Sequence, residues 1–495
     1  MTKTVLLVNA GNDPAMASLP NDNTFPALGV LHLGTYLKQE RPDLEVICRD
    51  GGATSQQSIE DDIRTYKPQV VGVSVLATSY QNALSTAKMA KEVDATVIFG
   101  NDQASQLSQE IITHQKSVDY VVGHEYGEKP LVRTIDAILN GEPARGIPSL
   151  TWRNPDGTAG GFEFTEETKK LLSIISQDGG YGGRRWGGLD QFPIPDRTLY
   201  PESHWKSFLE NYLEKYAQIH ETPVTGVATM NRARGCNRQK EDQCTHCDML
   251  LDVSYSSPDL FWQDAKSAFE QVGANVLYEV CDSFTSFRKF ISEVAKSKPD
   301  DLGFDPMFYV YGQAVDVAGN NSLIEQLTHI GVYRMNMGLE SGCDITLKDM
   351  KGLKDSVETN VQALQDLKEA GIKVYGSFVI GGSQLETPET LRETTEFAKY
   401  ILREGLVMDI EAQPILPLRN NMQGRWLKNN GLWITKETQP DWPDDIDTLS
   451  EVYINNATGI THEHAIEAVN EIRDAAKEHR IHFGSGVSSK SQYRQ

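Results

Sequence analysis

The stretch Arg234-Gly-Cys-Asn-Arg-Gln-Lys-Glu-Asp-Gln-Cys-Thr-His-Cys247 contains three of the six cysteines of the chain. Three thiolates on one loop can hold three irons of a cubane 4Fe–4S cluster and leave the fourth iron open for a substrate. The spacing of Cys236, Cys244 and Cys247 favours such a cluster, with a structural zinc site as the next interpretation and a redox dithiol or three unrelated core thiols behind it. A zinc site would need a fourth ligand, for which the candidates are His246, His220 and His204. The spacing alone leaves these interpretations open.

A regular alternation of short apolar runs and helical patterns begins just before this loop. The expected strands are residues 225–230, 275–280, 307–311, 332–337, 373–380 and 407–413. Six βα units predict a partial (β/α)6 barrel, whose active site lies at the carboxyl ends of the strands. The cysteine loop follows the first of these strands, so its position favours a catalytic role.

Terminal signals mark the helices of this barrel. Ser257-Pro258 opens a helix that Gly273 closes, Asp355 opens one that Gly371 closes, and Thr387-Pro388 opens one that Gly405 closes. A polar N-cap, Pro at the first helical position and Gly after the last turn are the residues that helix ends favour.

The N-terminal region alternates Val/Ile/Leu-rich runs with helical patterns. The runs are residues 4–9, 45–48, 69–75, 95–99 and 119–122. Continuous apolar strands separated by helices predict a Rossmann-like, doubly wound parallel sheet, which binds ligands at the carboxyl ends of its strands. We therefore expect an α/β chain with a sheet domain at 1–140, a connector at 141–223, the barrel at 224–435 and a small, mostly helical region at 436–495.

Composition limits the class of protein. The chain has 495 residues, 39% of them apolar, with 47 basic and 69 acidic residues and a net charge of −22. This balance argues against a nucleic-acid partner, because phosphate binding needs a basic surface. A local basic patch at Arg232, Arg234, Arg238 and Lys240 lies beside the cysteines, which suggests a cofactor or an anionic substrate. No signal peptide or membrane span is expected, and six cysteines without a disulfide framework favour the cytoplasm.

From residue 224 to about 415 the sequence resembles the radical S-adenosylmethionine superfamily. The cysteine triplet comes first. Glu279-Val-Cys-Asp-Ser-Phe284 stands where the family has an acidic motif for the methionyl amino group, here Glu279 and Asp282. Met337-Gly-Leu-Glu-Ser-Gly342 matches the fourth-strand element that approaches the ribose and methionyl groups, through Glu340 and Ser341. Gly376-Ser-Phe-Val-Ile-Gly-Gly382 matches the fifth-strand element near the adenine, with Ser377 and Gly381.

The sequence departs from the family pattern in three places. The first gap between cysteines is seven residues instead of three, which a longer loop can accommodate at little cost in free energy. His246 replaces the usual aromatic residue before the last cysteine. Cys281-Asp282 stands where relatives have two adjacent acids, so Glu279 is expected to share the role of the first acid. Cys281 and Cys343 are expected to be buried core thiols.

The N-terminal domain resembles the cobalamin-binding domains that precede many radical enzymes. The matching elements are Pro26-Ala-Leu-Gly29, the run ending at Ser74, Gly100-Asn-Asp102 and Gly123-His-Glu-Tyr-Gly-Glu128. The Asp-x-His-x-x-Gly signature that supplies a histidine to cobalt is absent, as is usual in the radical subgroup. The resemblance implies the following cobalamin-binding residues: Pro26, Leu28, Gly29, Ser74, Leu76, Gly100, Asn101, Asp102, Gly123, His124 and Glu125.

Together the resemblances imply a 4Fe–4S cluster held by Cys236, Cys244 and Cys247, with S-adenosylmethionine and cobalamin. The implied reaction is C-methylation of an unactivated carbon through a 5′-deoxyadenosyl radical and methylcobalamin, on a small or peptide-like molecule, with a flavodoxin or ferredoxin as electron donor. A cyclisation or rearrangement with the same cofactors is the first alternative, and a zinc-stabilised binding protein is a distant one. Residues near the barrel strand ends are candidates for the substrate wall: Tyr309, Tyr311, Gln313, Glu411 and Gln413.

Overall fold

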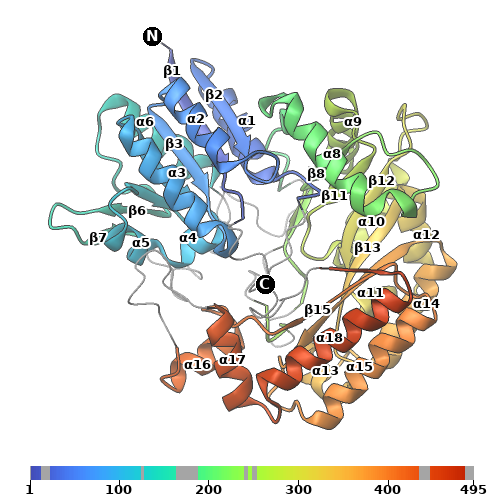
Figure 1. Ribbon diagram of the computed structural model, residues 1–495. Coiled ribbons are helices and arrows are strands. Elements are labelled where there is room, and N and C mark those ends of the chain that lie inside the picture. The colour runs from blue at the N-terminus through green and yellow to red at the C-terminus, as the bar shows by residue number, and fades with distance from the viewer. Residues whose placement is uncertain are drawn as a thin grey trace.

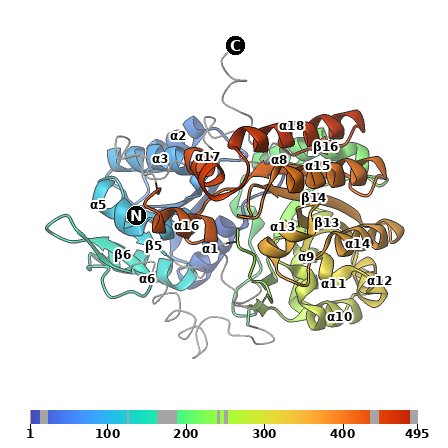
Figure 2. The same ribbon diagram turned by 90° about the horizontal axis from the view of Figure 1, so that it is seen from below.

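The computed structural model describes residues 2–12, 23–123, 127–162, 188–238, 243–247, 253–433 and 446–484. Two α/β parts lie side by side, one from the N-terminal third of the chain and one from the remainder (Figure 1). Figure 2 shows the same arrangement from below, with the N-terminal helices on one side and most of the barrel helices on the other; the helices at Met422–Asn429 and Ile446–Ala457 lie on the N-terminal side.

The N-terminal part is a seven-stranded sheet in the order β2-β1-β3-β4-β5-β6-β7. Its strands are β1 (Lys3–Asn9), β2 (Leu44–Asp50), β3 (Val70–Ser74), β4 (Thr96–Gly100), β5 (Tyr120–Val122), β6 (Leu150–Arg153) and β7 (Ala159–Gly161). The first five are parallel and follow the 2-1-3-4-5 order of doubly wound sheets that bind ligands where the order reverses. The predicted doubly wound sheet is confirmed.

Helices cover both faces of this sheet. They are α1 (Leu28–Glu40), α2 (Gln56–Tyr66), α3 (Tyr80–Glu92), α4 (Asp102–Gln106), α5 (Ser108–His114) and α6 (Glu128–Asn140). Leu6 and Val8 of β1 pack on the side of α2 and α3, whereas Val5 and Leu7 pack on the side of α1 and α6. Successive residues of one strand thus enter two different cores, which explains why the strand sequence is continuously apolar.

The segment 141–223, for which a connector was expected, contains more structure than its composition suggested. Strands β6 and β7 extend the N-terminal sheet as an antiparallel hairpin edge. Helix α8 (Glu202–Tyr216) then crosses to the barrel. Short polar and glycine-containing strands near a sheet edge lack the buried apolar run that identifies a central strand, so no strand was predicted there.

The second part is a seven-stranded parallel sheet in the order β16-β15-β14-β13-β12-β11-β8. Its strands are β8 (Val227–Met230), β11 (Val276–Glu279), β12 (Met307–Gly312), β13 (Val332–Glu340), β14 (Lys373–Ile380), β15 (Asp409–Pro414) and β16 (His482–Phe483). All six predicted strands are present, and the partial barrel is confirmed. The seventh strand, β16, comes from the C-terminal region that was expected to be mostly helical, and it pairs with β15.

Helices surround the outer face of this sheet. They are α9 (Pro258–Val272), α10 (Arg288–Lys296), α11 (Ala314–Val317), α12 (Asn321–Ile330), α13 (Asp344–Lys351), α14 (Val357–Glu369), α15 (Pro388–Arg403) and α18 (His462–Glu478). Helices α16 (Met422–Asn429) and α17 (Ile446–Ala457) lie nearer the N-terminal part. Ser257-Pro258 and Thr387-Pro388 begin α9 and α15 as predicted. Helix α14 differs, because Ser356 and not Asp355 is its N-cap and accepts a hydrogen bond from the Thr359 N–H. Asp355 is therefore available for another partner.

The lower part of the barrel interior is filled by side chains. The Arg334 guanidinium lies 5.0–5.1 Å from the ring centroids of Tyr216, Tyr309 and Tyr375 and 3.6 Å from the Asp409 carboxylate. Helix α8 contributes Tyr216 and packs against the inner face of the first barrel strands. A ligand in this barrel therefore lies at the carboxyl ends of the strands, since the opposite end is closed by this packing.

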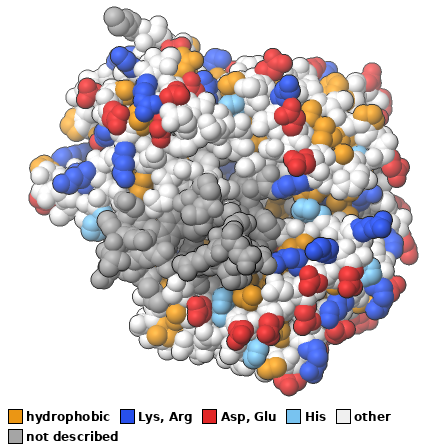
Figure 3. All heavy atoms as spheres, in the orientation of Figure 1, with side chains coloured by type: hydrophobic (Ala, Val, Ile, Leu, Met, Phe, Trp, Pro, Cys, Tyr) orange, Lys and Arg blue, Asp and Glu red, His pale blue; other side chains and the backbone are white. Residues whose placement is uncertain are grey.

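Charged side chains of both signs are interspersed over the described residues on the face shown in Figure 3. None of the helices in the described part of the chain has the length and apolar character that spanning a bilayer demands.

Candidate active site

The cysteine loop leaves the carboxyl end of β8, and Glu279 anchors its first residues. The buried Glu279 carboxylate accepts hydrogen bonds from the N–H groups of Arg232 (2.8 Å) and Ala233 (3.3 Å). Burial raises the pKa of Glu279 to about 8. Both of its oxygens face the loop backbone, so its geometry is that of a loop anchor, in contrast to the methionyl-binding role that the resemblance implied.

A fully buried ionic cluster supports the same segment. Asp264 of α9 pairs with Arg232 Nε at 2.7 Å and with Arg197 Nη2 at 2.8 Å. All three side chains have no solvent exposure. Arg232, which the sequence placed in a basic patch for an anionic ligand, is thus neutralised inside the protein.

Arg238 fixes the loop beyond Cys236. Its Nη2 donates to both carboxylate oxygens of Asp355, at 2.9 Å to Oδ1 and 2.8 Å to Oδ2. Asp355 is the residue that is not used as the cap of α14. Arg238 also donates through Nε to Gln313 Oε1 at 2.6 Å. Two different nitrogens of the guanidinium are thus held by two other segments, and the contact with Asp355 is charge-assisted, so this arginine has a structural role in the loop.

Gln313 connects the end of β12 to the first cysteine. Its amide donates to Cys236 Sγ at 3.4 Å and to Ser283 Oγ at 2.9 Å. Gln313 was predicted as part of the substrate wall, and the structure instead puts its side chain against the sulfur of Cys236. Hydrogen bonds to ligand sulfurs are one of the means by which proteins set the potential of an iron–sulfur cluster.

Backbone contacts hold the Cys244–Cys247 end of the loop. Thr245 N–H donates to Met350 O of α13 at 2.8 Å, and Met422 N–H donates to Thr245 O at 2.9 Å. Burial raises the pKa of the Cys236 and Cys244 thiols, and the nearby Arg238 acts in the opposite direction. An arginine beside two thiols favours their thiolate forms, which are the forms that bind metal.

No three His, Cys, Asp or Glu side chains within the described ranges converge as ligands of a single metal ion. A cubane cluster spreads its ligands over several irons, and three cysteines on one loop suit it.

Glu340 lies opposite the cysteine loop at a break in the β13 register. Its backbone is left-handed, with φ +58°, and its carboxylate is 3.6 Å from His246 Nε2 and 3.9 Å from Lys351 Nζ. A Cβ on Gly338 would lie 2.1 Å from Glu340 Oε1, so a larger residue there would displace this carboxylate. Left-handed backbone at a non-glycine residue is a form of strain that clusters at functional sites.

The other predicted barrel residues have different surroundings. Ser341 is buried and bonded to the hydroxyls of Thr346 (2.6 Å) and Thr394 (2.9 Å), so it stabilises the turn after β13. Gly381 has φ +73°, and a side chain there would collide with Ile454. Ser377 is opposite Gly338 on the neighbouring strand.

The predicted substrate wall is divided between two levels of the barrel. Tyr309 is buried in the aromatic floor, whereas the ring of Tyr311 is 41% exposed. Glu411 is buried and accepts a hydrogen bond from the Tyr375 hydroxyl. The buried Gln413 Oε1 has no partner within the described residues.

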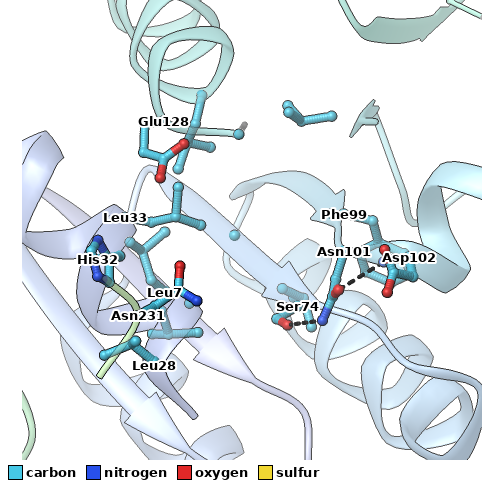
Figure 4. A pocket seen from close by; sticks show the side chains of 18 of the residues that line it. Leu7, Leu28, His32, Leu33, Ser74, Phe99, Asn101, Asp102, Glu128 and Asn231 are labelled. Carbon is cyan, nitrogen blue, oxygen red and sulfur yellow. Dashed lines mark hydrogen bonds between the residues drawn. The ribbon is translucent and has the colours of Figure 1, made fainter. Parts of the chain in front are cut away.

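A cavity of about 370 Å³ lies where the carboxyl ends of both sheets meet. Predicted residues in its wall are Leu28, Gly29, Ser74, Gly100, Asn101, Asp102 and Asp282. The segment before Cys236 forms the barrel side of the wall through Asn231, Arg234 and Gly235. Figure 4 shows His32, Leu28 and Asn231 on one side and Ser74, Asn101 and Asp102 on the other. Among the other predicted residues, Pro26, Leu76 and Gly123 are not in this wall, and His124 and Glu125 lie outside the described residues.

Two buried polar side chains of the wall were missed by the sequence analysis. Both ring nitrogens of His32 and the Oε2 atom of Glu128 have no hydrogen-bond partner among the described residues. Both residues are 4% exposed. Burial, with Arg232 and Arg234 adding to it, holds the pKa of His32 well below its usual range. His32 is four residues after the predicted Leu28 on α1, so helical spacing was the signal that pointed to it.

Comparison with known families matches both parts of the chain. Residues 19–133 match the B12 binding domain, and residues 230–398 match the radical SAM superfamily. The chain is a radical S-adenosylmethionine enzyme with a B12-binding domain. A radical SAM domain implies a 4Fe–4S cluster and S-adenosylmethionine, and a B12-binding domain implies cobalamin.

Curated relatives of this enzyme include members with different names. The chain is 23% identical over 385 residues to the anaerobic magnesium-protoporphyrin IX monomethyl ester cyclase of Rubrivivax gelatinosus. The match covers 76% of this chain and 62% of the cyclase. The chain is 22% identical over 386 residues to an uncharacterised methyltransferase of Pyrococcus horikoshii, covering 76% of this chain and 74% of the relative. The enzyme thus spans about three fifths of the length of the cyclase.

Solved structures share the fold of the enzyme. One is the radical S-adenosylmethionine methyltransferase TsrM of Kitasatospora setae, solved with cobalamin and a [4Fe-4S] cluster bound. Its TM-score is 0.64 at 17% identity, and the match covers 88% of this chain and 79% of the TsrM chain. The cobalamin-dependent S-adenosylmethionine radical enzyme OxsB, with aqua-cobalamin bound, has a TM-score of 0.59 at 17% identity and covers 94% and 56%. These likenesses extend over both domains.

The residues of this chain fit both groups. Orphaned polar atoms on His32 and Glu128 face a cavity, and the amides of a corrin carry both donors and acceptors that suit them. Three cysteines, one with an N–H donor at its sulfur, suit a cluster with one open iron.

Proposed function

We propose that this enzyme is a cobalamin-dependent radical S-adenosylmethionine C-methyltransferase that acts on an unactivated carbon of a small or peptide-like molecule. The observation that carries the proposal is the shared wall of the site. Asn231, Arg234 and Gly235 line the cavity between the domains, and Cys236 follows directly. A methyl donor in the cavity and a hydrogen-abstracting group at the cysteines would then face one substrate.

In this proposal Cys236, Cys244 and Cys247 hold the cluster, and Gln313 and Arg238 orient their loop. Asp282 and Glu340, with Ser377 beside them, orient S-adenosylmethionine. Tyr311, Glu411 and Gln413 form the substrate wall, and Tyr309 supports it from the floor. When bound, the cofactors supply hydrogen abstraction and a methyl group, and the protein binds, orients and excludes water.

The cavity residues divide between the two domains. Leu28, Gly29, Ser74, Gly100, Asn101 and Asp102 would contact the corrin from the sheet domain. We assign residues 1–140 to the cobalamin domain and 224–435 to the radical domain, with 436–495 packed on the barrel. A flavodoxin or ferredoxin would deliver the electron.

A second candidate reaction uses the same cofactors without methyl transfer. The similarity to a monomethyl ester cyclase supports cyclisation or rearrangement. The two reactions differ in their by-products, because methyl transfer from S-adenosylmethionine leaves S-adenosylhomocysteine.

Anaerobic reconstitution with iron, sulfide and cobalamin tests both candidates. We expect a brown protein with a 4Fe–4S absorption band, a bound corrin, and both 5′-deoxyadenosine and S-adenosylhomocysteine when substrate is supplied. 5′-Deoxyadenosine without S-adenosylhomocysteine would favour the cyclase-like reaction. Protein that is colourless and free of inorganic sulfide after reconstitution would contradict both.

A further inference from the structure

The segment that connects β8 to Cys236 belongs to two sites at once. Asn231, Arg234 and Gly235 line the cavity, and Cys236 is the next residue. Any shift of this segment therefore changes the cavity wall and the position of the first cysteine together.

An ion pair across the domain boundary holds this segment. Arg234 Nη2 lies 3.6 Å from Glu128 Oε1 at the first turn of α6. The guanidinium also lies over the ring of Phe192, 5.3 Å from its centroid, and donates through Nε to Asn231 Oδ1. Glu128 is buried and lines the cavity, so the pair links the wall of the N-terminal domain to the cysteine loop.

The turn between Arg234 and Cys236 is set by two further constraints. Gly235 has φ +89°, a left-handed conformation that favours glycine. Its N–H donates to Asp282 Oδ2 at 2.7 Å, and Asp282 also lines the cavity. The direction in which Cys236 leaves the wall is thus fixed by residues that face the cavity.

We propose that Arg234 and Glu128 are positioning residues that couple corrinoid binding to cluster binding. A corrinoid in the cavity contacts the wall that this pair holds and orders the segment before Cys236. When the corrinoid is bound, the cluster binds to a loop that is already ordered, so cluster binding no longer includes the entropic cost of ordering it. By reciprocity, the corrinoid and the cluster each raise the affinity of the protein for the other. The coupling does not depend on whether the reaction is methyl transfer or cyclisation.

The test measures the dissociation constant of hydroxocobalamin by absorbance titration, with full-length protein in two forms. One form carries the reconstituted cluster and the other has been freed of it by chelation. We expect wild-type protein to bind hydroxocobalamin at least about fivefold more tightly in the cluster-loaded form, the lower end of ordinary coupling. In Glu128→Gln this ratio should fall to about one. Glu128→Gln also removes a carboxylate that stabilises the N-terminus of α6, but this effect is the same with and without the cluster. It therefore cancels in the ratio of the two dissociation constants.

Two further variants isolate the ion pair. Ser74→Ala changes the cavity wall at β3, where Ser74 Oγ accepts a hydrogen bond from Asn101 and takes no part in the Arg234–Glu128 pair. It should therefore weaken binding in both forms and leave the ratio intact. The charge-exchanged pair Glu128→Arg with Arg234→Glu should restore the ratio that Glu128→Gln loses. A second readout uses the loaded enzyme alone, kept in excess dithionite so that the corrinoid is cob(II)alamin and the cluster is reduced in every sample. Adding the corrinoid should change the low-temperature EPR signal of the reduced cluster in wild type and not in Glu128→Gln.

A wild-type ratio of one would overturn the proposal. So would a Glu128→Gln protein that keeps both the wild-type ratio and the spectral change. Neither result would bear on the products of the reaction, so this inference and the proposed function fail separately.

Discussion

Replacing Asp264 tests whether the buried ionic cluster supports the cysteine loop. In Asp264→Ala, Arg232 and Arg197 lose a carboxylate at 2.7 and 2.8 Å inside a region without solvent exposure. Breaking a buried pair by removing one partner costs about 3–5 kcal/mol. We expect about 4 kcal/mol, the middle of this range, because the substitution removes the one carboxylate that the two arginines share. In a barrel of this size about 4 kcal/mol corresponds to a fall in melting temperature of roughly 8–16 °C.

The assay is thermal unfolding of the cofactor-free protein, followed by iron content after reconstitution. Asp264→Asn keeps the shape and one acceptor oxygen, so it should lose about half as much stability. Gln263→Ala on the exposed face of the same helix is the matched control and should stay within about 0.5 kcal/mol of wild type. If Asp264→Ala melts within about 2 °C of wild type, the cluster does not hold this segment and the reasoning is wrong.

Three further predictions concern the site itself. Cys236→Ala, Cys244→Ala and Cys247→Ala should each abolish 5′-deoxyadenosine formation, measured by chromatography after anaerobic reconstitution, and full activity in any one would remove that residue from the ligand set. Gln313→Leu removes the N–H that faces Cys236 Sγ, so the midpoint potential of the cluster should fall by on the order of 40 mV in an EPR-monitored titration; an unchanged potential would refute this. The lowered pKa of His32 means that below about pH 6.5 the unfolded chain binds a proton at this residue that the folded chain does not. The free energy of unfolding should therefore fall as the pH falls below this value, by about 1.4 kcal/mol per pH unit. His32→Gln should flatten the dependence of melting temperature on pH between 6.5 and 5, and an unchanged slope would show that other groups dominate it.

Much of the architecture was predictable because strand periodicity and helix-end residues are local signals. The parallel strands of both sheets and the helices opened by Ser257-Pro258 and Thr387-Pro388 follow from them. The edge strands β7 and β16 and the short strand β6 next to β7 were not predicted, because strands at or near a sheet edge need no continuous apolar run. Asp355 was expected to cap a helix, but a stronger partner, the Arg238 guanidinium, determines its position.

The candidate site was predictable only as a set of residue types in order. The sequence by itself determined the three cysteines after the first barrel strand and the polar residues at the strand ends, because these positions are fixed along the chain. Only the tertiary structure decided which of them meet. Glu279 faces the loop backbone, Gln313 faces a cysteine sulfur, and His32 and Glu128 face the cavity. The physical reason is that side-chain contacts between distant segments depend on how two separately folded sheets pack, and local periodicity carries no information about that packing.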